Sequence, residues 1–377
     1  MGKIKRIFYR IFLISMMVVV IAFLAFGGYI AYLGAQYYRI KDNTPVVIEN
    51  NQTEKINLSQ EYTISTFNIG FGAYSQDFSF FMDAGEFKDG RKVNGTGSRA
   101  KNKETVLYNT NGAIETIKNL NVDFAFFQEV DTKADRSHFV NQYEMIKNEF
   151  TGFSSSQTSN FHSGFLFYPF TNPHGAVEAG ITTLSKYNIT SCTRRSLPID
   201  ESFPTKFFDL DRCFNVNRIP INGTDKELIL INLHMSAYDA GGVYRAKQFK
   251  MLKEYMASEY ALGNYVIAGG DWNHDIANSI NAFQTDMKVP DWVAQIDETS
   301  IPENFSFVKT TNCATCRSTD IPYTINENGN YLSNYSVVID GFMISNNVQM
   351  NFVQNINTNF LYSDHNPAMM KFELKTP

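Results

Sequence analysis

The sequence predicts an α/β fold in which two mixed β-sheets pack face to face with helices outside, preceded by one membrane-spanning helix. Apolar runs rich in β-branched and aromatic residues, typical of strands, recur along the chain and greatly outnumber the segments with helical spacing. Many connections between these runs are too short for parallel crossovers, which favours mixed sheets over a doubly wound sheet. An uncharged apolar segment near the N-terminus is long enough to cross a bilayer.

The N-terminal segment is interpreted as a retained membrane anchor. Residues 1–10 carry Lys and Arg, whereas residues 11–35 contain no charged residue, which suits a membrane span with some tilt. A cleaved signal peptide, the alternative, would have a shorter apolar run of about 7 to 15 residues. The positive-inside rule places residues 1–10 in the cytoplasm and the rest of the protein outside. Polar residues 36–60 are expected to form a linker, and residues 61–377 the folded domain.

Within the domain, local patterns predict the elements in order. Strands are expected at 62–69, 122–128, 164–168, 179–184, 214–219, 228–232, 265–268, 337–344 and 368–372. Helices are expected at 103–120, 137–149 and 243–260. Residues 83–100 are rich in glycine and charge, so we expect a long loop there.

Charge and cysteine content exclude some classes of protein. A net charge of −5 and a pI near 5.7 argue against a broad cationic surface for duplex DNA. The four cysteines form no dense disulfide framework. Cys313 and Cys316 have the spacing of a metal or redox pair, but a zinc ribbon needs a second such pair. We therefore expect a disulfide between them if the domain is extracytoplasmic, with metal binding as the alternative.

Polar residues follow several of the apolar runs at the point where each strand is expected to end. A packed sheet delivers such side chains to one shared rim. Phosphate-ester hydrolysis needs charge neutralisation, an activated water and help for the leaving group, and these residue types supply all three. Glu129 and Asn68 offer the oxygen ligands that Mg²⁺ or Mn²⁺ prefers. Alone, a glutamate at a strand end is usually only solvated, so the prediction depends on the whole set.

Asp271 and Asn273 are two residues apart after a predicted strand. Asp271 is a candidate to orient or deprotonate the attacking water, and Asn273 to donate hydrogen bonds to phosphoryl oxygens. The alternative for this Gly-Asp-x-Asn pattern is a simple Asx turn.

Two histidines have a sequence context that suits catalysis. His365 is a candidate base, with Asp340 on a neighbouring strand as the acceptor that fixes its tautomer. His234 follows a buried strand and is a candidate to hold a phosphoryl oxygen or the leaving group. The other four histidines are interpreted as loop or surface residues: His138, His162, His174 and His274.

Taken together, these motifs resemble the endonuclease/exonuclease/phosphatase superfamily over residues 61–374. The matching motifs are Thr66-Phe67-Asn68-Ile69, Phe127-Gln128-Glu129-Val130, Asn232-Leu233-His234, Gly270-Asp271-Trp272-Asn273, Ile339-Asp340-Gly341-Phe342 and Ser363-Asp364-His365-Asn366-Pro367. The resemblance implies a four-layer α/β sandwich with a Mg²⁺ or Mn²⁺ ion at Glu129, near Asn68 and Asp364. It also implies phosphate contacts from His234 and Asn273, and an Asp340–His365 pair acting on the water. Whether Asp271 or His365 is the base stays open.

The resulting prediction is a membrane-anchored, outward-facing, divalent-metal-dependent phosphoesterase that hydrolyses a phosphodiester or phosphomonoester by in-line attack of water. Expected substrates are a phospholipid head group, a small phosphate ester or nucleic acid, and no protein partner is expected. The alternatives are a DNase I-like nuclease and, as a different class, a catalytically inactive binding module of the same fold. Residues 78–82 are a candidate lipid-contacting stretch. Arg212 and Arg317 are weaker candidates for phosphate binding, because single arginines usually pair with surface carboxylates.

Overall fold

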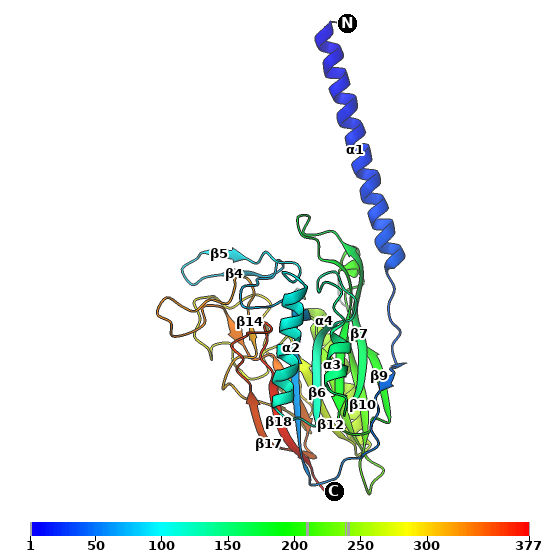
Figure 1. The fold of residues 1–377 in the computed structure, drawn as a ribbon, viewed down its shortest axis with the longest axis vertical. Coiled ribbons are helices and arrows are strands. Elements are labelled where there is room, and N and C mark those ends of the chain that lie inside the picture. Colours follow the sequence, from blue (N-terminus) through cyan, green and yellow to red (C-terminus); the bar gives the residue numbers. More distant parts are fainter. Residues whose placement is uncertain (1, 209–210, 238, 240–241, 377) are drawn as a thin grey trace.

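Two seven-stranded mixed sheets lie against each other at the centre of the domain (Figure 1). The computed structural model describes residues 2–208, 211–237, 239 and 242–376. In spatial order, the first sheet contains β1 (Thr44–Pro45), β9 (Ser191–Ser196), β10 (Cys213–Pro220), β11 (Glu227–His234), β12 (Tyr265–Asp271), β16 (Asp340–Ser345) and β13 (Phe305–Val308). The second sheet contains β17 (Val348–Asn355), β18 (Ala368–Leu374), β3 (Glu61–Asn68), β6 (Phe124–Asp131), β8 (Gly175–Ser185), β7 (Ser154–Leu166) and β2 (Ile48–Glu49).

Each sheet has a parallel pair of strands near its centre, namely β11 with β12 and β3 with β6. Strands in this position are buried on both faces and are therefore apolar at nearly every residue, as in Phe124–Phe127 of β6 and Leu228–Ile231 of β11. Because paired parallel strands end at the same edge, their polar last residues come together at one end of the sandwich.

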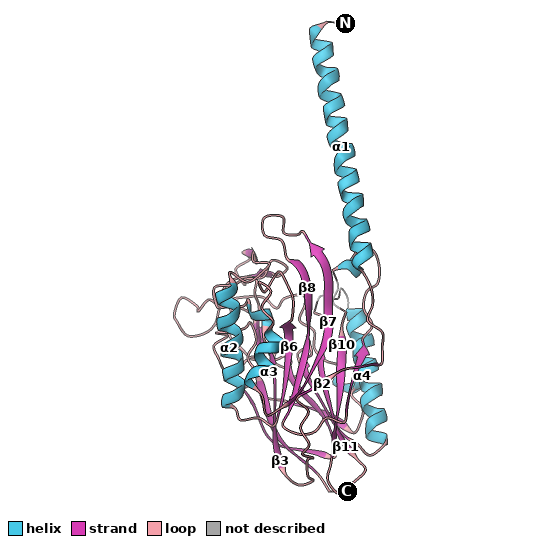
Figure 2. Cartoon of the chain, turned by 45° about the vertical axis from the view of Figure 1, so that its right-hand side comes forward, coloured by secondary structure: helices cyan, strands magenta, loops and turns pink. Residues whose placement is uncertain are grey.

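Helices cover the outer faces of both sheets (Figure 2). Residues of α2 (Lys103–Asn119) and α3 (Gln142–Glu149) join the apolar cluster on the outside of the second sheet. Residues of α4 (Val243–Ala261) pack against the first sheet. A third apolar cluster lies between the sheets and includes Ile64, Phe126, Leu230 and Ile267. This helix–sheet–sheet–helix order confirms the predicted four-layer sandwich.

Toward the ends of the parallel strands, the space between the sheets becomes polar. Gln128 Nε2 donates to Asn232 Oδ1 at 2.8 Å, and Asn215 Nδ2 donates to Thr158 Oγ1 at 3.2 Å. All four residues are buried. Buried amides and hydroxyls are tolerated because they are hydrogen-bonded to one another. The core thus changes from apolar to polar in the direction of the candidate site.

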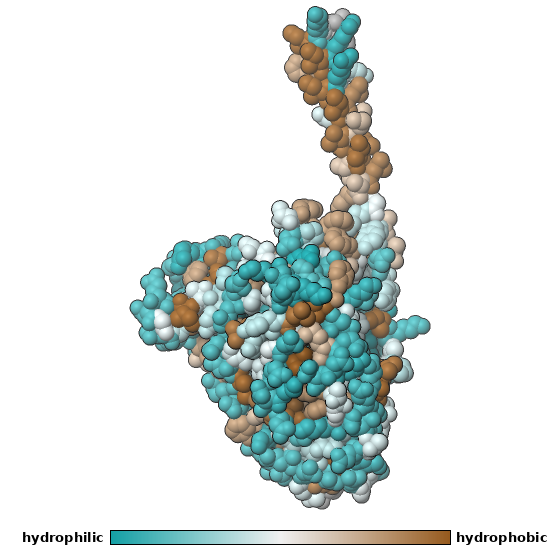
Figure 3. All heavy atoms as spheres, viewed as in Figure 1, coloured by the Kyte–Doolittle hydropathy of each residue, from teal (hydrophilic) through white to brown (hydrophobic). Residues whose placement is uncertain are grey.

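Helix α1 (Lys3–Gln36) projects from the domain, with apolar side chains along most of its length and polar ones at its N-terminal end (Figure 3). It is long and apolar enough to span a membrane. The helix begins at Lys3 and so includes most of residues 1–10 as well as the predicted span. Its last turns touch the domain, where Leu33 is buried with Leu166 and Phe207.

Residues 36–60, expected as a linker, are packed against the domain. Strand β1 pairs with β9 of the first sheet, and β2 pairs with β7 of the second. Arg39 Nε donates to Asp211 Oδ1 at 2.8 Å. The segment therefore crosses from one sheet to the other before the chain enters β3.

Several strands lie where the sequence predicted none or much less. Strand β7 begins ten residues earlier than the predicted start at residue 164, and β9, β13 and β17 were not predicted. The expected loop at 83–100 contains a small ribbon of β4 (Ala84–Glu86) and β5 (Lys92–Asn94). A second ribbon pairs β14 (Cys316–Arg317) with β15 (Ser336–Val337).

Candidate functional site

The carboxylate of Asp271, at the end of β12, is the centre of a buried polar cluster. Its Oδ2 accepts a hydrogen bond from Asn68 Nδ2 at 2.9 Å. The same oxygen lies 3.3 Å from His234 Nε2 and 3.8 Å from His365 Nε2. His234 is directly opposite Asp271 in the parallel pair β11–β12. Residues from both sheets and from the C-terminal loop therefore meet at one oxygen atom.

Gly270 allows β12 to approach β11 closely beside this carboxylate. Its φ is +145°, and a Cβ placed there would lie 2.0 Å from Leu233 O. No other residue fits without moving one of the two central strands. After the strand, Asn273 has φ +49° and donates its backbone N–H to Asp271 Oδ1 at 2.9 Å. This is the Asx turn considered as the alternative for the Gly-Asp-x-Asn motif, and it fixes the orientation of Asp271.

The side chain of Asn273 is also engaged, because its Nδ2 donates to Met235 O at 2.8 Å. That contact ties the turn after β12 to the residue that follows β11. The phosphate-binding role expected for Asn273 stays a prediction.

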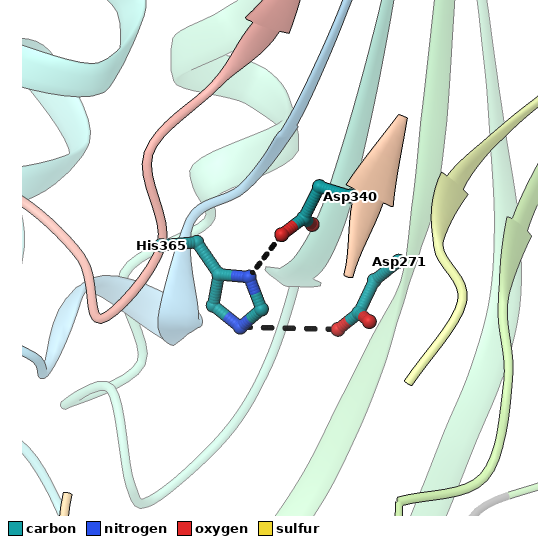
Figure 4. Close-up of side chains that lie close together, drawn as sticks. All are labelled: Asp271, Asp340 and His365. Atoms are coloured by element: carbon teal, nitrogen blue, oxygen red, sulfur yellow. Dashed lines mark hydrogen bonds and ion pairs between the residues drawn. The ribbon is translucent and has the colours of Figure 1, made fainter. Parts of the chain in front are cut away.

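His365 and Asp340 form a buried pair beside Asp271 (Figure 4). His365 Nδ1 lies 2.8 Å from Asp340 Oδ2, which leaves Nε2 on the side that faces Asp271. The backbone N–H of Asp340 donates to Thr315 Oγ1 at 3.0 Å, and the N–H of His365 donates to Ser363 Oγ at 3.2 Å. The contact with Asp340 thus sets which nitrogen of the imidazole faces Asp271.

Glu129 reaches the site through a β-bulge. The register of β6 against β8 shifts between Phe127 and Val130, and Glu129 has φ +55°. A bulge redirects a side chain, and a positive φ at a residue with a Cβ is strained, so such features gather at functional sites. Glu129 Oε1 accepts a hydrogen bond from Asn68 Nδ2 at 3.2 Å.

Asn68 bridges two carboxylates in this arrangement. Its Nδ2 contacts both Glu129 and Asp271, while its Oδ1 accepts a hydrogen bond from Gly70 N at 3.0 Å. The loop that carries Asp364 packs against the same strand end, because Ser363 Oγ donates to Asn68 O at 2.8 Å. Asn68 therefore positions the acidic groups, and its predicted role as a metal ligand is a separate proposal.

The three aspartates of the site, Asp271, Asp340 and Asp364, have raised pKa values. Burial, and then the neighbouring Asp340 carboxylate, raises the pKa of Asp271 to about 6. Burial also raises the pKa of Asp364 to about 6, and the charge of Glu129 adds to this shift while His365 opposes it. Like charges held together in a poorly solvated site resist ionisation. A bound cation would relieve that repulsion.

The pKa values of the two site histidines, His234 and His365, shift in opposite directions. Burial favours a neutral His365, but the carboxylates of Asp340 and Asp364 outweigh it and raise its pKa well above the usual value. Burial lowers the pKa of His234, and the positive charge of Arg212 lowers it further. We therefore assign a charged ring to His365 and a neutral ring to His234 near neutral pH.

Two groups of side chains offer ligands for a metal. The ligand atoms of Asp271, Asp340 and His365 all lie within 4.8 Å of one another, but Nδ1 of His365 faces Asp340. Glu129 and Asp364 are half-buried carboxylates that repel each other. Oxygen donors suit Mg²⁺ and Mn²⁺, so this second pair fits a hard divalent cation.

All eight predicted site residues lie at the same end of the sandwich. They are Asn68, Glu129, His234, Asp271, Asn273, Asp340, Asp364 and His365. Asn68, His234 and Asp271 end their strands, whereas Asp340 begins β16 and Asp364 and His365 lie in the loop before β18.

Arg317 is a site residue that sequence reasoning undervalued. Its side chain is 1% exposed rather than paired at the surface, and its backbone N–H donates to Asp364 O at 3.0 Å. Within the described part of the chain, Nε and Nη2 have no hydrogen-bond partner. Two free donors on a buried guanidinium suit an anionic ligand. Arg317 follows Cys316 in a segment without periodicity, so no local signal indicated its burial.

Other expectations were wrong. Cys313 and Cys316 are free thiols and not a disulfide. Their sulfur atoms contact Asn355 O and Arg317 O respectively. Phe78 is buried in an apolar cluster and Phe80 packs against it, so the aromatic residues of the 78–82 stretch are buried or half-buried and Met82 alone is exposed among the five. His174 is buried as well, with Nδ1 2.6 Å from Ser98 O.

Comparison with known proteins identifies the family. Residues 106–324, more than half of the chain, match the model of the Endonuclease/Exonuclease/phosphatase family. No curated protein matches the sequence. Three solved structures of low sequence identity show the same fold. An endonuclease/exonuclease/phosphatase from Beutenbergia cavernae DSM 12333 is 12% identical with a TM-score of 0.55, over 84% of this chain and 72% of that one.

The other two structures are covered completely by this chain. D. rerio TDP2 in complex with a single-strand DNA product is 12% identical with a TM-score of 0.52, over 84% of this chain and 100% of that one. ANGEL2, described as a 2',3'-cyclic phosphatase and bound to adenosine-2',3'-vanadate, is 14% identical with a TM-score of 0.52, over 90% of this chain and 100% of that one. The protein belongs to the endonuclease/exonuclease/phosphatase family.

Proposed function

We propose that the protein is a divalent-metal-dependent phosphoesterase. The observation that carries this proposal is the convergence on Asp271 Oδ2 of Asn68, His234 and His365, three residues that lie far apart in the sequence. A binding module without catalytic activity has no need for so many buried polar groups, which are costly to keep together. Family membership supports the same conclusion.

In the proposed reaction, Asp271 orients the attacking water and accepts its proton. Its raised pKa of about 6 makes the carboxylate a better base than a solvated aspartate, yet leaves it ionised at neutral pH. The Asn273 N–H and the Asn68 amide hold it in place. We therefore assign the base to Asp271 and not to His365.

His365, kept protonated by Asp340, directs its Nε2–H toward the negative charge of the phosphoryl group. His234 is neutral and donates from Nε2 to the same region. Arg317 provides two further buried donors. When bound by Glu129 and Asp364, Mg²⁺ or Mn²⁺ would neutralise charge on the phosphoryl and leaving oxygens.

A direct test uses the full-length protein in detergent with bis-p-nitrophenyl phosphate. We expect hydrolysis that requires Mg²⁺ or Mn²⁺, is abolished by EDTA and returns when metal is restored. Glu129→Gln should lower the rate about 100-fold or more, because a neutral amide is a poor ligand for a hard cation. Glu303→Gln, at an exposed position, is the matched control. Hydrolysis that persists in EDTA would refute the metal-dependent mechanism.

For the substrate, we propose a phosphate ester presented outside the cell membrane, either a phospholipid head group or a small soluble ester. Helix α1 supports this location, since it is long and apolar enough to anchor the domain beside a bilayer. The second candidate is an extracytoplasmic nuclease, supported by the single-strand DNA product bound to TDP2. A screen of the full-length protein with and without EDTA against DNA, RNA, sphingomyelin and inositol phosphates separates these classes.

A further inference from the structure

The β7–β8 hairpin extends beyond the candidate site. Both β6 and β7 are antiparallel to β8, so β6 and β7 run in the same direction. Val130 of β6 and Ser159 of β7 both pair with Gly180. Strand β7 then continues to Leu166, which carries the hairpin roughly 20 Å past the level of Val130 at about 3.3 Å per residue. Figure 1 shows this hairpin at the same end of the domain as α1.

Helix α1 leaves the domain beside this hairpin. Tyr29 Oη donates to Phe165 O at 3.1 Å, and Phe165 N donates to Tyr32 Oη at 3.0 Å. The rings of Tyr29 and Phe167 lie edge to face, with centroids 5.2 Å apart. Tyrosine is enriched where a spanning helix leaves the hydrocarbon core. In a bilayer spanned by α1, these contacts would hold the hairpin at the level of the membrane interface.

Exposed aromatic side chains surround the end of α1. On the hairpin loop, Phe167, Tyr168 and Phe170 are 50%, 62% and 83% exposed. On another loop, Phe203 and Phe208 are 62% and 48% exposed, and Phe207 between them is buried in a cluster with Leu33 of α1. We call these five exposed residues the aromatic collar. Single exposed apolar residues are common, but a group of aromatics beside an anchor helix indicates an interaction surface.

We propose that the aromatic collar inserts into the interfacial region of the bilayer that α1 spans, so that the site end of the sandwich faces the membrane surface. The bilayer is favoured over a protein partner because the collar is continuous with the exposed apolar surface of α1. Aromatic rings with an adjacent basic residue suit the head-group region, and Lys206 Nζ lies 5.0 Å from the Tyr37 ring centroid at this level. Combined with the proposed function, on which this part rests, the orientation gives the site direct access to phosphate esters of lipid head groups.

Fluorescence quenching by brominated lipid tests the contact without relying on catalysis. The full-length Phe170→Trp variant is reconstituted in phosphatidylcholine vesicles with and without phosphatidylcholine brominated near the head-group end of its chains. The control is Phe352→Trp, an exposed position on β17. It lies at the opposite end of the sheet, because Phe352 pairs with Lys371 and Lys371 with Thr63 at the start of β3. Native Trp272 and Trp292 give the same background in both variants.

We expect the signal from Trp at position 170 to fall roughly two-fold in brominated vesicles and the signal at position 352 to stay unchanged, as insertion of the collar at the acyl boundary requires. In a Phe203→Trp protein, the added change Phe170→Asp should weaken quenching, because a charge at the hairpin tip opposes insertion. Equal quenching at 170 and 352 would overturn the proposal. Quenching confined to 170 in a protein without phosphoesterase activity would support the collar and refute the proposed function instead.

Discussion

His365 Nδ1 and Asp340 Oδ2 are 2.8 Å apart in a site where both side chains are buried. Removal of the Asp340 charge should therefore leave the histidine in place but change its protonation. We expect Asp340→Asn to lower kcat by about 100- to 1,000-fold, the range typical of losing one group that stabilises charge in the transition state.

The pH titration of His365 distinguishes an electrostatic role of Asp340 from a merely structural one. Asp340 raises the pKa of His365, so the Asp340→Asn variant should titrate His365 at a lower pH, as followed by NMR of the imidazole protons. Asp291→Asn, at an exposed position, is the matched control. An unchanged His365 titration in the variant would contradict the electrostatic coupling.

Arg317 is expected to bind the substrate phosphate. Lysine at this position keeps the charge but loses the fork of donors, so Arg317→Lys should raise KM for phosphate esters about tenfold or more with a smaller effect on kcat. Arg91→Lys, at a surface position where the guanidinium pairs with Asp89 and lies over the Phe87 ring, should leave KM unchanged. Steady-state kinetics of both variants would show whether the guanidinium contacts substrate; an unaltered KM for Arg317→Lys would remove it from the binding site.

Gly270 is predicted to be essential for the fold at the site. An alanine Cβ would lie 2.0 Å from Leu233 O, so Gly270→Ala should lower the free energy of unfolding by about 2 kcal/mol or more. Gly152→Ala is the control, because no atom lies within 4 Å of the position that its added methyl group would take and its φ is not positive. Thermal unfolding measured for both variants should show a lower Tm for Gly270→Ala alone.

His174 should make the domain less stable in acid. Burial, and then the charge of Arg136, lowers the pKa of His174 to about 3, so the unfolded chain binds a proton between about pH 6.5 and pH 3 and the folded protein does not. The contribution of His174 to the free energy of unfolding is thus fully present above about pH 6.5 and declines as the pH falls toward 3. His174→Asn retains a donor for Ser98 O and does not titrate, so its Tm should fall less steeply across this interval than that of the unaltered protein. Parallel slopes for the two proteins would show that His174 does not titrate on unfolding.

The central strands could be predicted from the sequence because burial on both faces leaves a continuous apolar run, as in β6 and β11. Most of strand β7 escaped prediction for the opposite reason. Its first half is made of Ser, Gln and Thr. These polar side chains can be buried because they are hydrogen-bonded, as in the bond from Ser156 Oγ to Asn217 Oδ1 at 2.9 Å. Such a partner in another sheet leaves no trace in local hydrophobic periodicity.

The candidate site likewise contains residues that could be predicted from the sequence and residues that could not. Asp271 and His234 could be grouped from the sequence because each ends an apolar strand, and the resemblance to a known family joined them to Asp340 and His365. The bulge that turns Glu129 inward and the burial of Arg317 depend on pairing with β8 and on packing of the 310–335 segment. These are tertiary effects, which propensity and spacing do not encode.

The stretch that joins α1 to β3 also covers one edge of each sheet. Strand β1 covers β9 and β2 covers β7, the strands that would otherwise end the two sheets. An edge strand with unpaired N–H and C=O groups can form hydrogen bonds with a strand of another chain. A soluble form that starts at residue 61 would expose the edges of β9 and β7 for such pairing, whereas proteolytic shedding between α1 and residue 44 would leave both of these edges covered.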